Sequence, residues 1–565
     1  MLDRLEELKR SFSPEDGQRA ERHLAQLARR RFPDAAALIR FHEILLFMRA
    51  YPQSPAIVQK TEELLASFHR RVEQLYESGA EGLSALIEPE VSGIAGTSFS
   101  SIWSYEIVRH LAARYPSQVE IDWDGYQAEP LLVPILKRVL PLFEDGAYAE
   151  YPVPFLEWLQ AAKARGERDL VWLLRRFQQL PISDKERADL FDALKLWVNW
   201  ELKNSPATRT RMRKHVRKIF YQNRPLLSRS EVSLEQELAN ASPLPLQKLS
   251  RVEGERILHL GRDTMTIRNR ELHGFTYGDP HHVLRAEIGH GVDFYIWGVT
   301  PKHRLPMLGY HAVLIFKNGV PAGYAESLSL FERTEVGLNL FYTFRDGESA
   351  WIYARLLRLF RQYLGVSVFS IEPYQIGFKN EEGIESGAFW FYRKLGFRPI
   401  RPELARMVLS EEHKIATRVG YRTPARILRQ LAGGHVLYEA PSGNHPGDWD
   451  NFHVRHLGLA VQRRMAQHFN GDEQKIRRAS AEQVARALGV RIADWNESER
   501  RAFSDFALML ALIPNLSRWS KEEKRAIACI IRAKAEAEEF RYVRLLQTHS
   551  KLRDEVIQIG SRDVD

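Results

Sequence analysis

The spacing of hydrophobic residues separates the chain into segments of two kinds. Through about residue 240, hydrophobic positions recur every three or four residues, as Phe41, Ile44, Leu45 and Met48 do. This spacing places apolar side chains on one face of a helix. The first part of the chain, residues 1–240, is therefore predicted to be helical.

A pattern typical of strands begins near Val292. The stretches "GYHAVLIF" and "PAGYAESLSLF" are rich in β-branched and aromatic residues, and the pair Asn318-Gly319 lies between them. Asn-Gly favours the type I′ turn of a two-residue hairpin. The sequence therefore predicts an antiparallel hairpin at this point, and a third strand is predicted over 334–344.

Strands and helices alternate after the hairpin. Apolar residues at helical spacing predict a helix over 349–363, and "VSVFSIEP" has the composition of a buried strand. Because a helix separates this strand from the third one, the two should run parallel. A short helix is predicted over 386–395, with Gly396 as its stop, and "RMVLS" is predicted to close the sheet.

Domain boundaries follow from composition and length. A chain of 565 residues exceeds what one hydrophobic core usually serves. The stretch "ANASPLPLQKLS" has two prolines and no period, which indicates a linker, and helical spacing returns after about Leu409. The predicted fold class is α+β multidomain. A mixed α/β sheet domain over 251–411 lies between all-helical regions at 1–240 and 412–565.

Composition indicates a soluble cytoplasmic protein. Hydrophobic residues make up 44% of the chain and charged residues 27%. No apolar run reaches the ~18 residues of a membrane span, so no membrane partner is expected. The acidic start "MLDRLEELKR" lacks the features of a signal peptide, and the single cysteine, Cys529, cannot form an internal disulfide.

The net charge of +9 is concentrated in residues 209–229, which are rich in arginine and lysine and hold no acid. Met212, Val216, Ile219 and Phe220 fall at helical spacing, which predicts a basic amphipathic helix. Its basic face could bind nucleic acid or an acidic partner. It could equally be a solvated face that balances acids elsewhere in the fold.

Several chemistries lack support in the sequence. His281, His282 and His290 lie without cysteines or carboxylates at ligand spacing, so no metal is expected. No Gly-x-Ser-x-Gly elbow, P-loop or dinucleotide fingerprint occurs, which argues against hydrolase, kinase and dehydrogenase functions.

The stretch "SGAFWFYRKLGFRP" carries a resemblance to a known family. From Ala388 to Phe397 it reads Ala-x-x-Phe-Tyr-x-Lys-x-Gly-Phe. Together with the hairpin "VLIFKNGVPAGYAES", this resembles the GNAT superfamily of N-acyltransferases over about residues 310–409. The resemblance implies an acyl-CoA co-substrate, acetyl-CoA or another acyl-CoA, with no metal, and a small-molecule or peptide amine as acceptor.

The resemblance also implies where acyl-CoA would lie. In that family the pantetheine arm runs beside the third strand, and the pyrophosphate lies on the amides that begin the crossover helix. By position, the cofactor-binding residues would be Leu340, Phe341, Tyr342, Arg345, Gly347, Glu348 and Ser349.

Tyr392 takes the position of the family's catalytic tyrosine, which protonates the departing thiolate. A phenol is chemically suited to that role, although Tyr392 could instead be one more aromatic residue of the core. Glu326 is the candidate general base. Glu335 lies on another strand that flanks the cleft in the family, and spacing alone does not decide between the two carboxylates.

Two functions are therefore predicted as alternatives. The first is acyl-CoA-dependent N-acyl transfer, with acetyl transfer to an amine as its expected form. The second is a catalytically inactive GNAT-fold protein that binds or scaffolds a partner. Asp346 and Glu348 favour the second, because they would place negative charge beside a pyrophosphate, and Glu385 stands where the family often has asparagine.

Overall fold

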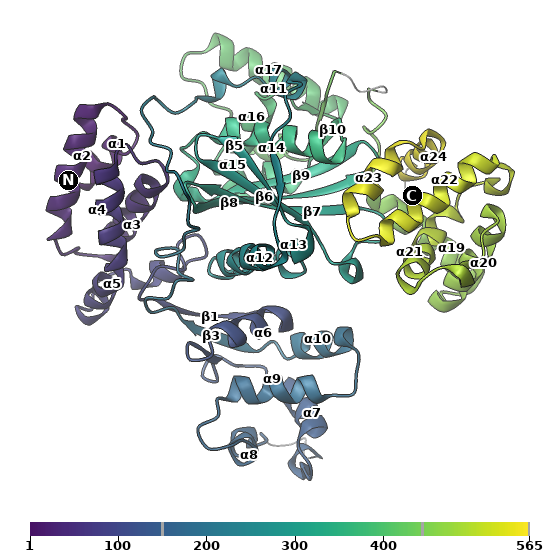
Figure 1. Cartoon of the computed structure of the whole chain (residues 1–565), viewed down its shortest axis with the longest axis horizontal. Helices are drawn as coiled ribbons and strands as arrows, with labels where there is room; N and C mark the ends of the chain where they lie inside the picture. The colour runs from purple at the N-terminus through teal and green to yellow at the C-terminus, as the bar shows by residue number, and fades with distance from the viewer. Residues whose placement is uncertain (148–151, 442–445, 563–565) are drawn as a thin grey trace. The chain divides into compact units, whose positions relative to one another are not determined.

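The computed structural model describes residues 1–147, 152–441 and 446–562, and Figure 1 labels most of its helices and strands. The chain divides into two compact units. The first unit comprises residues 1–225, 256–276 and 317–321, and the second comprises 226–255, 277–316 and 322–565. Among the described residues, no helix combines the length and the apolar content needed to cross a membrane.

Helices dominate the first unit. Asp34 and Ser54 begin two of them by accepting a hydrogen bond from an amide three residues further along, the usual N-cap arrangement. The helices of this unit are α1 (Leu2–Leu8), α2 (Pro14–Ala28), α3 (Ala35–Ala50), α4 (Pro55–Ala66), α5 (Phe68–Glu77), α6 (Tyr105–Arg114), α7 (Glu129–Val139), α8 (Phe155–Ala162), α9 (Asp169–Gln179), α10 (Asp184–Ala193), most of α12 (Arg251–Thr266), and α13 (His273–Thr276).

The prediction of an all-helical N-terminal region is wrong in one respect. A three-stranded antiparallel sheet with the order β1-β3-β2 lies within it. Its strands are β1 (Ser98–Ile102), β2 (Val119–Ile121) and β3 (Trp197–Glu201). Strands this short give too few alternating positions to stand out from helical spacing in the sequence.

The prediction of a basic helix over 209–229 is also wrong. Residues 209–228 form no helix, and Arg229 begins only a single 3₁₀ turn, Arg229–Glu231. Backbone amides of the segment bond to other parts of the first unit, from Arg209 to the Gly93 carbonyl (2.7 Å) and from Gln222 to the Pro52 carbonyl (2.8 Å). Because these amides are used in tertiary bonds, the segment stays irregular. The prediction that a basic helical face in this segment binds nucleic acid or an acidic partner therefore loses its structural basis.

A nine-stranded mixed sheet forms the centre of the second unit. The strand order is β11-β12-β10-β9-β8-β7-β6-β5-β4. The strands are β4 (Leu246–Lys248), β5 (Leu284–Gly289), β6 (Val292–Gly298), β7 (Gly309–Lys317), β8 (Val320–Leu330), β9 (Arg333–Leu340), β10 (Val368–Ile371), β11 (Arg398–Pro399) and β12 (Val436–Glu439).

The predicted hairpin and crossover are both present. Asn318 and Gly319 join β7 to β8 with φ values of 49° and 79°, the positive region that a type I′ turn requires. The crossover helix α14 (Ser349–Leu364) links β9 to β10, and these strands pair in parallel. β9 ends at Leu340, four residues earlier than predicted, and a 3₁₀ turn, Tyr342–Phe344, follows it.

Two details of the second unit differ from the prediction. "RMVLS" lies inside a helix, α17 (Pro402–Thr417), in which Leu404, Val408 and Glu411 are buried at helical spacing. A five-residue apolar run alone does not distinguish strand from helix. The sheet instead ends with β12 and β11, and β12 lies in the region 412–565 that was predicted to be all-helical.

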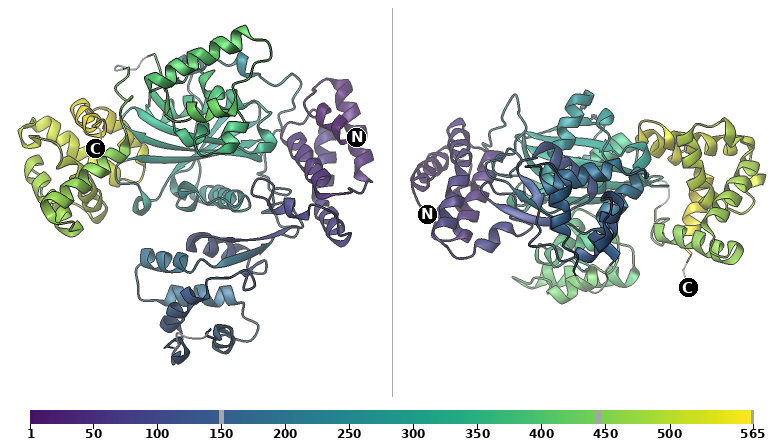
Figure 2. Two further views of the ribbon diagram at one scale, coloured as in Figure 1. Left: turned by 180° about the vertical axis from the view of Figure 1, so that it is seen from behind. Right: turned by 90° about the horizontal axis from the view of Figure 1, so that it is seen from below.

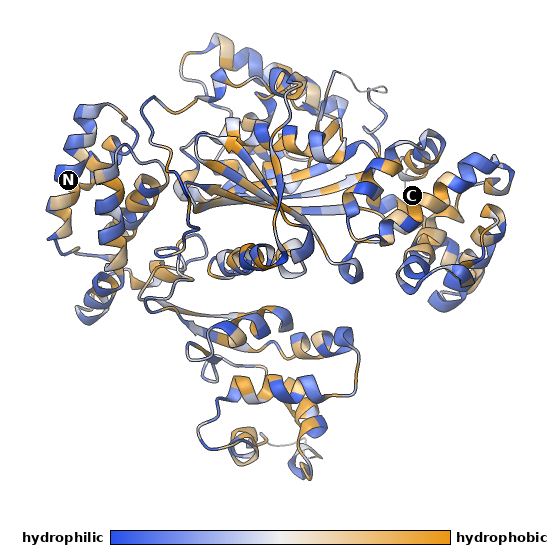
Figure 3. Ribbon diagram, in the orientation of Figure 1, coloured by the Kyte–Doolittle hydropathy of each residue, from blue (hydrophilic) through white to orange (hydrophobic). Residues whose placement is uncertain are grey.

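The remaining helices of the second unit flank the sheet or follow it. α19 to α24, in yellow-green and yellow, gather beside one end of the sheet in the left view of Figure 2. Hydrophobic and hydrophilic residues alternate along these helices in Figure 3, as amphipathic packing requires. The helices are α11 (Leu234–Ala239), α15 (Glu381–Glu385), α16 (Ala388–Arg393), α18 (Ala425–Leu431), α19 (Val454–Phe469), α20 (Glu473–Leu488), α21 (Glu497–Leu510), α22 (Lys521–Ala535), α23 (Glu539–Gln547) and α24 (Ser550–Gly560).

Candidate active site

The parallel strands β9 and β10 pair over only a short stretch. Val368, Phe369 and Ser370 of β10 are in register with residues 333–335 of β9. β10 ends at Ile371, and Pro373 begins a 3₁₀ turn, Pro373–Ile376. Proline has no amide hydrogen to continue a ladder. β9 continues to Leu340, paired with β8, so the two parallel strands separate beyond residue 335.

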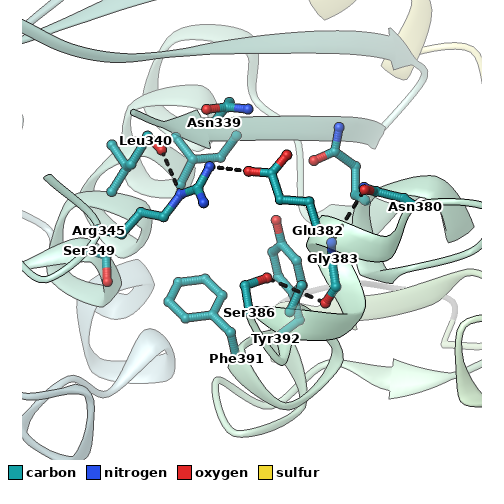
Figure 4. A pocket seen from close by; sticks show the side chains of 13 residues that line it. Asn339, Leu340, Arg345, Ser349, Asn380, Glu382, Gly383, Ser386, Phe391 and Tyr392 are labelled. Carbon is teal, nitrogen blue, oxygen red and sulfur yellow. Dashed lines mark hydrogen bonds and ion pairs between the residues drawn. The ribbon is translucent and has the colours of Figure 1, made fainter. Parts of the chain in front are cut away.

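A pocket of about 240 Å³ opens where these strands separate (Figure 4). Leu338, Asn339 and Leu340 line it from the end of β9. Arg345 and Ser349 line it from the loop before α14 and the first turn of that helix. The opposite side is formed by the segment from the 3₁₀ turn to α16, through Gln375, Asn380, Glu382, Gly383, Ser386, Ala388, Phe391 and Tyr392.

Tyr392 is a buried residue whose hydroxyl points into this pocket in Figure 4. Its ring is packed edge-on against Tyr353, with ring centroids 5.4 Å apart, and against Phe397 at 5.7 Å. Only 4% of the residue is exposed. Burial raises the pKa of the Tyr392 phenol above its usual value. The phenol is therefore protonated at neutral pH, which suits a proton donor and not a base.

The first turn of α14 is open to the pocket through Ser349. The N-cap residue Glu348 makes no side-chain cap to this helix. Its carboxylate is instead within 3.0 Å of His290 Nδ1, and the residue is 1% exposed. The first amides of a helix have no partner within the helix and favour anions. One of the two carboxylates expected beside a bound pyrophosphate is thus buried against a histidine.

Arg345 and Glu382 form an ion pair at the pocket. Arg345 Nε also donates to the Leu340 carbonyl at 3.2 Å, which fixes the guanidinium near the end of β9. Glu382 lies on α15, so the pair joins the two sides of the pocket (Figure 4). An anionic ligand would have to compete with Glu382 for this arginine.

Asn380 and Glu382 are pocket residues that sequence reasoning did not assign. Asn380 Oδ1 accepts from the Gly383 amide at 3.3 Å and so caps α15, and Asn380 Nδ2 donates to the Tyr374 carbonyl at 2.9 Å. Glu385, at the position where the GNAT family often has asparagine, is exposed and does not line the pocket. The sequence did hold one signal for the helix that carries these residues. Asn380 followed by two glutamates is a typical N-cap pattern and predicts that a helix begins there.

The predicted cofactor residues divide into two groups. Leu340, Arg345 and Ser349 line the pocket. The others are not among the lining residues: Phe341, Tyr342, Gly347 and Glu348. Of these, Phe341 is 3% exposed and belongs to the core.

Neither candidate base lines the pocket. Glu326 lies on β8, in register with Gly337 of β9, and accepts a hydrogen bond from the Tyr310 hydroxyl. Burial tends to raise the pKa of Glu335, but the hydrogen bond with His435 and the charge of Arg333 hold it below its usual value. Glu335 is therefore an ionised member of a buried network. Glu326 as the base stays a prediction.

The histidines considered for metal binding have carboxylate partners. His281 and His282 lie 3.0 Å and 2.9 Å from the two oxygens of Asp279, and His290 contacts Glu348. Among the described residues, no group of three or more potential ligands is placed to hold a metal ion.

No protein-family model matches this chain, and no curated protein or solved structure matches it either. The functional argument therefore rests on the residues of the pocket and on their geometry.

Proposed function

We propose that the second unit is an acyl-CoA-dependent N-acyltransferase of the GNAT kind, which transfers an acetyl group from acetyl-CoA to the amine of a small molecule or peptide. The observation that carries this proposal is the separation of β9 from β10 beside the Tyr392 hydroxyl. The amides of an extended pantetheine arm can hydrogen-bond along the end of β9 that lines the pocket, as an added strand would. About 240 Å³ is enough for the thioester end of such a ligand.

The proposed reaction uses Tyr392 as the general acid. The amine nitrogen attacks the thioester carbonyl, so a C–N bond forms and the C–S bond breaks. Tyr392 donates its phenolic proton to the departing sulfur, and the nitrogen loses a proton to a base, for which Glu326 is the predicted residue. The phenol then regains a proton from solvent and the base releases one to it, and the products are an amide and a free thiol.

Binding of acetyl-CoA is the first test. A ligand that binds only the folded chain at 100 times its Kd adds about 2.7 kcal/mol to the free energy of unfolding. We therefore expect acetyl-CoA to raise the melting temperature of the full chain in a thermal unfolding assay. No shift at millimolar acetyl-CoA would contradict the acyltransferase proposal and favour the inactive scaffold.

Replacing Glu382 with glutamine is expected to strengthen CoA binding. Glutamine has no charge to hold Arg345, so the guanidinium becomes available to the phosphates of the ligand. A partly exposed ion pair contributes ~0.5–1 kcal/mol, which corresponds to a twofold to fivefold lower Kd. Isothermal titration calorimetry with CoA measures this change.

Glu381→Gln is the matched control for that experiment. Glu381 is the neighbouring residue of α15 and pairs with Arg429, and it does not line the pocket. Its replacement should leave the Kd for CoA unchanged. If Glu382→Gln weakened CoA binding, Arg345 would not be a phosphate ligand held back by this carboxylate.

A further inference from the structure

A second cleft, in the first unit, is larger than the pocket beside Tyr392. Its volume is about 590 Å³. Residues of α6 and α9 line it together with the part of α12 that belongs to the first unit. A cavity of this size is within the range that accepts small organic ligands.

Four arginines line this cleft: Arg109, Arg114, Arg175 and Arg262. Arg109 pairs with Glu106 at 3.2 Å, and Arg175 pairs with Glu167 at 3.0 Å, so two of the four charges are locally balanced. Arg114 is exposed and lies 3.9 Å from Asp263, a longer separation than those of the other two pairs.

Arg262 is the most enclosed of these arginines. It donates to the carbonyls of Phe275 and Thr276, both at 3.1 Å. Among the described residues, no carboxylate lies within 4 Å of its guanidinium. Glu106 and Asp263 act on this charge through longer-range electrostatics, and burial still lowers the pKa of Arg262. An anionic ligand would give the guanidinium a direct charged partner and so reduce the cost of its burial.

Two stacked histidines form another part of the wall. His110 Nε2 lies 2.7 Å from Asp263, and the rings of His110 and His259 are 5.3 Å apart. His259 Nδ1 is buried and has no hydrogen-bond partner among the described residues. Burial lowers the pKa of His259 to about 4, helped by the positive charges of His110, Arg114 and Arg262 against the opposing charge of Asp263. Most of the charged groups that act on His259 are therefore positive.

The cleft also has an apolar side. Ala112, Ala113, Val171 and Leu174 line it next to the arginines. Guanidinium groups match phosphate oxygens in geometry and charge, and apolar side chains can cover the organic part of a ligand.

We propose that this cleft binds a small organic phosphate, with its phosphate group held by Arg114 and Arg262 and its organic part against the apolar side. A single carboxylate can be bound by one arginine, whereas a phosphate dianion can accept hydrogen bonds from several of the arginines that line this cleft. The volume of the cleft, about 590 Å³, fits a ligand of mononucleotide size.

The test uses the full chain, with adenosine monophosphate and inorganic pyrophosphate as probes in magnesium-free buffer. Isothermal titration calorimetry should detect binding of both probes, and Arg114→Gln should raise each Kd about tenfold, since a charge-assisted hydrogen bond is lost. Arg165→Gln is the matched control, because Arg165 is an exposed arginine of the same unit outside the cleft. It should leave both Kd values unchanged.

A second measurement uses the unmodified chain, so its result does not depend on whether a variant folds. The pKa of His259, followed by NMR, should rise when pyrophosphate binds, because negative charge beside the ring favours the imidazolium. The proposal is overturned if neither probe binds, or if the pKa of His259 stays unchanged at saturation. It is also overturned if Arg165→Gln weakens binding as much as Arg114→Gln does.

Two competing ligands complete the experiment. Citrate that binds as tightly as pyrophosphate would replace the phosphate proposal with a polycarboxylate site. A single-stranded oligonucleotide that binds more tightly than either probe, with an affinity that falls steeply with salt, would indicate a nucleic-acid surface instead. For a small-phosphate cleft, we expect citrate and the oligonucleotide to bind more weakly than the two phosphate probes.

Discussion

Tyr392→Phe is expected to lower kcat for acetyl transfer about 100-fold or more, while the Kd for acetyl-CoA changes little. Loss of a positioned general acid typically costs 10²–10⁴-fold. The ring stays in place against Tyr353 and Phe397, so packing around the pocket is preserved and only the proton donor is removed. Steady-state kinetics with acetyl-CoA and an amine acceptor, together with calorimetry, separates the two quantities.

Tyr353→Phe is the control for that substitution. Tyr353 also presents a buried phenol, in contact with the ring of Tyr392, but it does not line the pocket. Its hydroxyl has no hydrogen-bond partner among the described residues, so its removal should leave kcat and stability nearly unchanged. Equal losses for the two variants, or a Kd that rises in step with the loss of kcat, would contradict the acid role of Tyr392.

Glu43→Gln is expected to lower the free energy of unfolding of the first unit by about 3–5 kcal/mol. The Glu43 carboxylate receives hydrogen bonds from Arg209 at 3.0 Å and 2.8 Å and lies 2.9 Å from His42 Nδ1. All three residues are buried. Removing one charge of a buried ion pair leaves the other uncompensated in a medium of low polarity, which accounts for the large cost.

Chemical denaturation of the full chain, followed by circular dichroism, measures this loss. Glu63→Gln is the matched control, because Glu63 is an exposed residue of the same unit that pairs with Lys60. That variant should unfold at the same denaturant concentration as the unmodified chain. If Glu43→Gln also left the unfolding midpoint unchanged, the buried network around Arg209 would not hold the first unit together.

The sequence by itself determined the elements that depend on neighbouring residues. The turn at Asn318-Gly319 follows from two residues that tolerate positive φ, and α14 follows from apolar spacing within one segment. The parallel pairing of β9 and β10 follows from the helix between them. The candidate role of Tyr392 also came from a local pattern, the resemblance of residues 388–397 to a family signature, and that role stays a prediction. These features need no knowledge of distant residues.

Only the tertiary structure decided the features that depend on distant partners. Arg209 is part of a buried ion pair with Glu43, 166 positions away, and the segment that follows it is irregular although its apolar residues fall at helical spacing. Glu382 reaches the pocket because α15 is placed opposite the end of β9, and there it pairs with Arg345. The physical reason is that buried charges and backbone amides bond to whichever groups the fold brings near them, and sequence spacing does not record those groups.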